Sequence, residues 1–289
     1  MNTGRRFAGA LAITVTAMVV AAGAVTNEKL VLVTVVATPA KPLFTLTPAD
    51  FAVTEENDKV TVIEAVPAKD PLSIVVLVDT ALPADGRALT PEMRNALKAF
   101  VTAIQGGEPT ARIALYQVAN AALPVTEFTS DRVSLDAGIS VIASGTPTGS
   151  KMLEGVVTAA KLLGDRPAPR RAIVCIAIGT EEGTSLNPKV VYDAVRKSGA
   201  TLWVISVQGF RDPSLTNRDT VWTRATEDTG GLRLNAVQAN RLDVQLQSIA
   251  NSLLSQYYLK MVRTRDGAVK PFKGQAAGAS PVLFTRWMR

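Results

Sequence analysis

The feature that most constrains this fold is a set of strand-length segments in which apolar residues follow one another without alternation. The three clearest cover residues 73–78, 172–178 and 201–207. Such runs are typical of parallel strands that are covered by helices on both faces. Segments with helical periodicity separate or follow them, at residues 91–104, 131–142, 150–163, 188–197, 220–228 and 239–255. Because strands alternate with helices, the sequence predicts an α/β fold with a doubly wound, mostly parallel sheet and helices on both faces.

Outside this core, both ends of the chain change to β-type patterns. These segments alternate or are rich in β-branched residues, and they cover residues 29–36, 52–63, 257–262 and 281–287. We therefore expect the N- and C-terminal flanks to form one small β-rich subdomain. The predicted organisation is a leader at 1–24, a β-rich flank at 25–70, the α/β domain at 71–255 and a returning flank at 256–289.

The first 24 residues have the pattern of an export signal. Arg5 and Arg6 supply a positive start, residues 7–20 are uncharged and apolar, and Ala22-Gly23-Ala24 offers a cleavage point. The run from 7 to 25 is also long enough to span a membrane, so an uncleaved anchor is the alternative. In both cases we expect an exported protein, periplasmic or extracellular, that contacts the membrane only through this segment.

Composition excludes several kinds of chemistry. The 289 residues include one cysteine and no histidine. Zinc sites of the Cys/His kind, histidine triads and a disulfide within the chain are therefore excluded. Cys175 lies inside an apolar run, which predicts a buried and inert thiol. Residues 145–151 resemble a phosphate loop, but the preceding segment has a helical pattern where such a loop needs a strand.

The net charge of +6 is concentrated near the C-terminus. Beyond Tyr257, Asp266 is the only acidic residue, and the basic residues are Lys260, Arg263, Arg265, Lys270, Lys273, Arg286 and Arg289. One interpretation is an edge strand that cations keep soluble. The other is an electrostatic docking surface for anionic envelope polymers or lipid. Nucleic acid is not expected as a partner, because an exported protein does not meet it and no binding motif is present.

Polar residues mark the ends of the apolar strands. In an open parallel sheet, ligands bind beyond the carboxyl ends of the strands, where the strand order reverses. Asp79 directly follows the first apolar run, Ser150 is expected to open a helix after a loop, and Ile178-Gly179 closes a later strand. We therefore expect Asp79 and Ser150 to lie together at this edge.

The segments at these positions resemble the von Willebrand factor A-type (VWA) family from about Pro71 to Ser255. The resemblance rests on residues 74–79, 148–150 and 173–179. Flanks at 46–53 and 255–259 resemble a bacterial exported subfamily, the VWFA-related proteins abundant in acidobacteria. The resemblance implies a VWA fold with a metal-ion-dependent adhesion site at the strand ends, and a role in binding.

The family's adhesion site holds one Mg²⁺ or Mn²⁺ through an Asp-x-Ser-x-Ser strand end, a threonine in the middle loop and an aspartate after a later strand. Asp79 matches the first aspartate and Ser150 replaces the threonine. The three remaining positions are Ala81, Pro83 and Ile178. The resemblance therefore implies a degenerate metal site of which Asp79 and Ser150 remain, and we expect no cofactor. The carboxylates that could restore Mg²⁺ or Mn²⁺ binding are Asp85, Glu181 and Glu182.

A carboxylate in such a crevice needs partners, because burying it unpaired costs several kcal/mol. The helix expected to begin at Ser150 would direct free N–H groups toward Asp79. Lys151 could supply a cation where the metal is missing. We therefore expect Asp79 and Ser150 to be a hydrogen-bonded pair that this helix caps.

Together these features predict a non-catalytic exported protein that binds a protein or an anionic envelope ligand. No nucleophile–base pair supports an enzyme. Two alternatives stay open. One is a hydrolase that uses carboxylates of the crevice, and the other is a structural envelope subunit that assembles by β-strand addition at its flanks.

Overall fold

The computed structural model describes residues 28–36, 45–81, 90–143, 145, 149–178, 182–207, 216–236, 241–264, 267–276 and 280–285. The expectations for the leader at 1–24 and for Pro83, Asp85, Thr148, Gly179 and Glu181 concern positions outside these ranges. No helix within the described ranges is long and apolar enough to cross a membrane.

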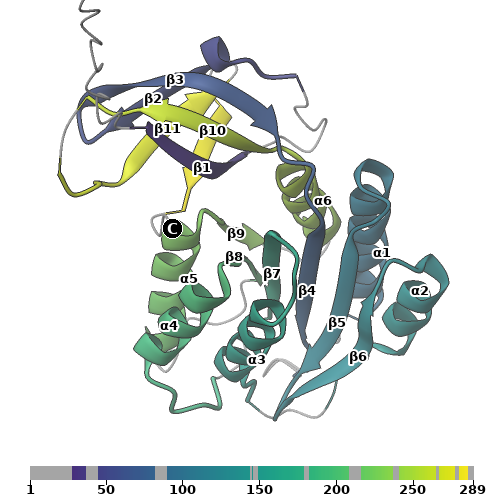
Figure 1. Ribbon diagram of the computed structural model, residues 1–289. Helices are drawn as coiled ribbons and strands as arrows, with labels where there is room; N and C mark the ends of the chain where they lie inside the picture. The colour runs from purple at the N-terminus through teal and green to yellow at the C-terminus, as the bar shows by residue number, and fades with distance from the viewer. Residues whose placement is uncertain are drawn as a thin grey trace, which may run out of the picture.

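A six-stranded sheet forms the centre of the α/β domain (Figure 1). Its strands follow in the order β6 (Ala122–Thr129), β5 (Arg112–Val118), β4 (Leu72–Asp79), β7 (Arg170–Ala177), β8 (Thr201–Val207) and β9 (Arg233–Ala236). All neighbours are parallel except β6, which is antiparallel to β5. The chain builds outward from β4 in both directions, so the order reverses at the carboxyl end of β4, beside Asp79.

Helices cover both faces of this sheet, as the uninterrupted apolar runs predict. One face packs against α1 (Thr90–Gly107), α2 (Arg132–Val141) and α6 (Leu242–Leu254), and the other against α3 (Met152–Gly164), α4 (Pro188–Ser198) and α5 (Thr216–Thr229). All eight residues of β4 are buried. Ile74 and Val76 contribute to the first core, whereas Val75 and Leu77 contribute to the second. Cys175 is buried in the second core, where burial raises its pKa.

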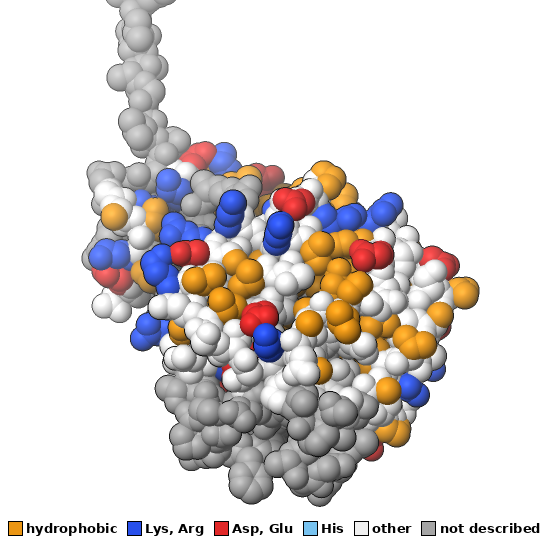
Figure 2. Space-filling model, turned by 90° about the horizontal axis from the view of Figure 1, so that it is seen from below, with side chains coloured by type: hydrophobic (Ala, Val, Ile, Leu, Met, Phe, Trp, Pro, Cys, Tyr) orange, Lys and Arg blue, Asp and Glu red, His pale blue; other side chains and the backbone are white. Residues whose placement is uncertain are grey.

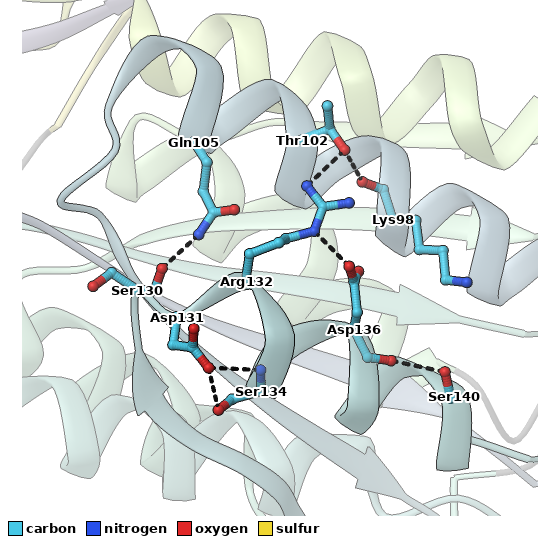
Figure 3. Close-up of polar contacts among 9 residues, drawn as sticks. All are labelled: Lys98, Thr102, Gln105, Ser130, Asp131, Arg132, Ser134, Asp136 and Ser140. Atoms are coloured by element: carbon cyan, nitrogen blue, oxygen red, sulfur yellow. Dashed lines mark hydrogen bonds and ion pairs between the residues drawn. The ribbon is translucent and has the colours of Figure 1, made fainter.

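Polar side chains fix the start of α2 against α1 (Figure 3). Asp131 caps α2, because its Oδ2 accepts hydrogen bonds from the backbone N–H of Ser134 at 2.8 Å and from its hydroxyl at 2.6 Å. These bonds lower the pKa of Asp131. Arg132 forms an ion pair with Asp136 at 2.8 Å and donates to the Thr102 hydroxyl of α1 at 3.0 Å. Asp131 therefore caps the start of α2, and Arg132 ties that start to α1.

The two flanks of the chain form a closed six-stranded barrel. Its strands are β1 (Glu28–Val35), β10 (Gln256–Val262), β3 (Asp58–Pro67), β2 (Phe51–Glu55), β11 (Phe272–Ala276) and β12 (Ser280–Phe284), with a short 3-10 turn, η1, at Pro48–Asp50 before β2. The ring closes because β1 pairs with both β10 and β12. The predicted fold class, a VWA-like α/β sheet with a β-rich subdomain from both flanks, is confirmed. The interpretation of the basic segment beyond Tyr257 as an edge strand is wrong, because β10, β11 and β12 each lie between two neighbours in the closed barrel.

A buried ion pair inside the barrel uses one of the C-terminal cations. Arg263 donates from Nε and Nη2 to the two carboxylate oxygens of Glu55, each at 2.8 Å, and both side chains are buried. Lys260 forms an ion pair with Glu28 at 2.8 Å. Two of the basic residues beyond Tyr257 are therefore paired with acidic residues of the barrel itself.

Arg170 holds the barrel against the α/β domain. The barrel lies at the N-terminal ends of the parallel strands, opposite to Asp79 (Figure 1). Arg170, at the start of β7, donates to Glu108 Oε2 at 2.7 Å, to the Leu253 carbonyl at 2.7 Å and to Gln256 Oε1 at 2.8 Å. Its side chain is 2% exposed. One guanidinium thus ties together the residue that follows α1, the end of α6 and the start of β10.

Candidate functional site at the carboxyl edge of the sheet

Asp79 is the buried end of the central strand. Its Oδ1 accepts a hydrogen bond from the Ala81 N–H, and its Oδ2 accepts one from the Ile178 N–H, both at 3.2 Å. The carboxylate therefore joins the ends of β4 and β7. Ile178, which the resemblance aligns with the family's later aspartate, offers a backbone N–H and an apolar side chain.

Ser150 lies in the loop before α3, where it pairs with another loop and does not begin the helix. α3 begins at Met152 with Lys151 as its cap residue, so the prediction that Ser150 opens the helix is wrong. Instead Ser150 forms an isolated parallel bridge with Glu182, and its carbonyl accepts from the Gly183 N–H at 2.8 Å. Its hydroxyl is fully buried without a hydrogen-bond partner. The pairing with the segment after β7 holds Ser150 in an extended conformation.

Glu182 is brought into this site from the loop after β7. Its Oε1 accepts a long hydrogen bond, 3.5 Å, from the Leu153 N–H in the first turn of α3. The helix N-terminus that was expected to cap Asp79 thus donates to Glu182, and a negative charge is favourable there. The predicted hydrogen bond between Ser150 and Asp79 is wrong, because the Ser150 hydroxyl has no hydrogen-bond partner. Of the three carboxylates considered as replacement ligands, Glu182 is the one that lies within the described ranges, and it lies close enough to Asp79 for their charges to interact.

The cation of the site is Arg218, which the sequence analysis did not identify. Its Nη1 lies 3.7 Å from Glu182 Oε2, and both side chains are 3% exposed. Its charge also interacts with that of Asp79. Lys151, the cation that was expected here, forms a half-exposed ion pair with Glu154 at 3.4 Å instead. The guanidinium comes from the first turn of α5.

Burial shifts the pKa of both Glu182 and Arg218. Burial raises the pKa of Glu182 to about 7, although the Arg218 charge and the Leu153 N–H oppose the rise. Burial also lowers the pKa of Arg218, and the charges of Glu182 and Asp79 oppose that change. The Arg218 Nε and Nη1 atoms and Glu182 Oε2 have no hydrogen-bond partner. The ion pair between Arg218 and Glu182 is therefore loosely made.

A signal for Arg218 was present in the sequence. The helix was expected at 220–228, whereas α5 begins at Thr216. Its buried residues include Val221, Trp222 and Ala225. Position 218 precedes these by three, four and seven residues, so it lies on the same face of the helix. A charged residue on the apolar stripe of a helix indicates a buried partner, and correct placement of the helix start would have revealed it.

The donor set around Asp79 is poor for a divalent ion. Mg²⁺ needs six oxygen ligands in octahedral geometry and usually one or two carboxylates. The Asp79 oxygens accept N–H bonds, the Ala81 and Ile178 side chains are buried without oxygen, and a guanidinium neighbours Glu182. Among the described residues there is no group of three or more His, Cys, Asp or Glu that could hold a metal ion.

Charges of both signs surround this end of the molecule. Figure 2 views the molecule from below, the end at which β4 and β5 finish in Figure 1. Hydrophobic side chains gather in the middle of the described surface, with separate acidic and basic side chains among them. Two exposed apolar residues belong to elements near this edge, Leu123 at the start of β6 and Val141 at the end of α2.

A doubly wound sheet with an aspartate at its switch point, beside the loops that carry Ser150 and Ile178, defines an α/β domain of the VWA type. Comparison with solved structures agrees. The chain is similar to a von Willebrand factor type A protein from Catenulispora acidiphila, with 11% identity, a TM-score of 0.51, and coverage of 90% of this chain and 72% of that one.

Two further structures show the same fold over a shorter range. The vWF domain of the type V pili tip protein Mfa5 from Porphyromonas gingivalis matches with 13% identity, a TM-score of 0.50, and coverage of 64% of this chain and 96% of that one. Proximal thread matrix protein 1 from the mussel byssus matches with 14% identity and a TM-score of 0.51 over 65% of this chain. The match spans about half, 49%, of the mussel protein. No protein-family model and no curated protein matches the sequence.

Proposed function

We propose that this chain is a non-catalytic, exported protein of the VWFA-related kind that binds a protein partner at the carboxyl edge of its sheet without a divalent metal. The observation that carries the proposal is the buried Arg218 beside Glu182 and Asp79. A guanidinium supplies the positive charge that a metal supplies in a working adhesion site. The Arg218 charge thereby offsets negative charge of Glu182 and Asp79 in the crevice. In this proposal the adhesion site is degenerate.

A protein partner suits this end better than an anionic polymer. A polyanion is attracted to a surface with one sign of charge, whereas the described surface here mixes both signs (Figure 2). Hydrophobic side chains also gather in the middle of this described surface (Figure 2), and an apolar patch rimmed by polar residues is typical of a protein contact. Leu123, 53% exposed, and Val141, 67% exposed, belong to elements near this edge. A pilus tip protein shares the fold, which is compatible with a binding role outside the cytoplasm. The export signal at 1–24 supports the same location.

The test is capture of the partner from a bacterial envelope extract with immobilised protein. We expect the same partner to be retained in Mg²⁺ and in EDTA. Arg218→Ala should weaken retention, whereas Arg224→Ala, which removes an exposed arginine from the same helix, should not. Circular dichroism checks that both variants are folded, and Arg218→Lys tests whether charge alone suffices. Loss of the partner in EDTA would overturn the proposal.

A hydrolase is the second candidate, because a carboxyl with a pKa near 7 can act as a general acid or base. Glu182 has that property. However, its side chain is only 3% exposed and is paired with Arg218, so a substrate does not reach it without a rearrangement. Hydrolysis of ester, peptide or glycoside substrates that Glu182→Gln abolishes would favour this candidate.

A structural subunit that assembles by strand addition is the third candidate function. The flanks form a closed barrel in which every described strand has two neighbours, so this subdomain presents no free edge for another chain. The edges of the α/β sheet are β6 and β9. Such a subunit would therefore have to open its barrel or pair at β6 or β9.

A further inference from the structure

A second concave site lies between the barrel and the α/β domain, at the end of the sheet opposite to Asp79. It is a cavity of about 470 Å³. This volume falls in the range of small-molecule pockets, roughly 300–1,000 Å³, and such pockets occur preferentially where two domains meet. None of its lining residues belongs to the crevice at the carboxyl edge.

The barrel contributes an apolar wall to this cavity. Along β1, Val31 and Val33 point into the barrel core, so Leu30 and Leu32 face outward. Leu32 pairs in register with Tyr258 of β10, and Leu283 of β12 extends the same wall. Leu30 is 69% exposed. Leu32 and Leu283 are partly buried, and Leu283 also packs against the core of the α/β domain. Together with the exposed Leu30 they give this side of the cavity an apolar surface that suits an alkyl chain.

The α/β domain contributes a basic wall. Arg171 lies at the start of β7 and Arg196 in the last turn of α4. Arg171 is held in place, because its Nη1 donates to the Ser198 carbonyl at 2.6 Å and its Nη2 to the Arg166 carbonyl at 2.5 Å. Among the described residues that line the cavity, two are arginines and none is acidic. The cavity therefore has a positive side and an apolar side.

We propose that this cavity binds a single-chain amphiphile with an anionic headgroup, of the fatty-acid kind. The alkyl chain would lie against Leu30, Leu32 and Leu283, and the carboxylate would face Arg196 and Arg171. Arginine suits this task because its guanidinium matches a carboxylate geometrically. The cavity is too small to bury both chains of a phospholipid. This site is independent of the proposed partner site around Arg218.

Isothermal titration calorimetry with decanoate, below its micellar concentration, tests the proposal on the full chain. We expect saturable binding of decanoate at one site. Acetate has the headgroup alone, and decanol has the chain alone. Each should bind with a Kd at least about tenfold higher than that of decanoate. Phosphatidylglycerol vesicles, which offer two-chain lipids, should not compete with decanoate. Competition would assign the cavity to a membrane surface instead.

Variants locate the binding. Arg196→Gln should weaken decanoate binding roughly five- to tenfold without changing that of decanol. Leu30→Gln should weaken both, and its exposure makes a folding defect unexpected. Arg132→Gln, which removes a half-exposed arginine from α2, is the matched control and should change neither. Absence of decanoate binding, or binding that Arg196→Gln and Leu30→Gln leave unchanged, would overturn the proposal. Arg218→Gln should leave decanoate binding intact, so failure here is distinguishable from failure of the crevice proposal.

Discussion

Single residues set the energetics of this protein where arginines are buried. Arg170, Arg218 and Arg263 each lie inside the fold with a carboxylate partner. A buried pair contributes little compared with apolar residues of similar size, but removal of one partner leaves a buried charge and is strongly destabilising. The three pairs differ in geometry. Arg170 and Arg263 lie 2.7 and 2.8 Å from their partners Glu108 and Glu55. Arg218 lies 3.7 Å from Glu182, in the crevice at the carboxyl edge.

Arg170→Met should lower the free energy of unfolding by about 3–5 kcal/mol, because Glu108 then stays largely buried without its partner. Arg132→Met is the matched control. Its pair with Asp136 is 40% exposed on both sides, so the loss should stay below about 1 kcal/mol. Urea unfolding of the two variants measures the difference. Equal losses would contradict the assignment of Arg170 as the tie between barrel and sheet.

Glu182 makes stability depend on pH. Its pKa is raised from 4.5 to about 7, so the folded state holds the proton where the unfolded state has released it. The folded state is thus favoured at low pH, and this contribution is lost as the pH rises from about 4.5 to about 7. Glu182→Gln should flatten the decline between these values. A stability profile for Glu182→Gln that parallels the wild type across this window would contradict the raised pKa.

At the scale of elements, the end of α5 depends on two adjacent glycines. Gly230 adopts a φ of +72°, the left-handed conformation that ends helices. A Cβ on Gly231 would lie 1.9 Å from the Leu202 carbonyl oxygen of β8. The close approach lets β9 join the sheet directly after the helix.

Gly231→Ala should therefore destabilise the protein by about 1–3 kcal/mol, because backbone has to move apart. Gly106→Ala in α1 is the control, since nothing lies within 4 Å of the added Cβ. It should be neutral or stabilising by up to about 1 kcal/mol. Thermal melting of both variants decides the point, and a tolerated Gly231→Ala would show that β8 and α5 are not packed so closely.

At the scale of the whole molecule, the two chain ends depend on each other. β1, β2 and β3 come from the N-terminal flank, and β10, β11 and β12 from the C-terminal one. β2 pairs with β11 and β1 with β12. Removal of residues 270–289 deletes β11 and β12 and so opens the barrel along both of these strands.

Hydrogen exchange after that truncation should accelerate in residues 28–67 and change little in β4, β5, β7 and β8. The sheet keeps its two helical layers, whereas the barrel loses its closure and part of its core around Phe272 and Phe284. Full protection of 28–67 in the truncated chain would mean that the N-terminal flank is stable without its partner strands.

The sequence predicts those parts of the fold whose signal is local. The buried strands, the covering helices and the β-type flanks follow from periodicity, and Asp79, Ser150 and Ile178 were placed at the correct edge of the sheet. Closure of the barrel was not predictable, because strand pairing between residues more than 200 positions apart leaves no local pattern. Arg218 was missed for a related reason: its partner Glu182 comes from another loop, and the start of α5 was placed four residues late.

The melting temperature with and without divalent metal tests whether this site works without an ion. A ligand at a hundredfold excess over its Kd adds about 2.7 kcal/mol to stability, which for a domain of this size raises the melting temperature by roughly 5–10 °C. We predict no such rise for the wild type in millimolar Mg²⁺ or Mn²⁺, because in the proposed site Arg218 supplies the positive charge beside Glu182 and Asp79. A combined variant, Ala81→Ser, Pro83→Ser, Ile178→Asp and Arg218→Gln, restores the family's ligands and removes that cation, and it should show the rise. A metal-induced rise in the wild type that Asp79→Ala abolishes would contradict the account.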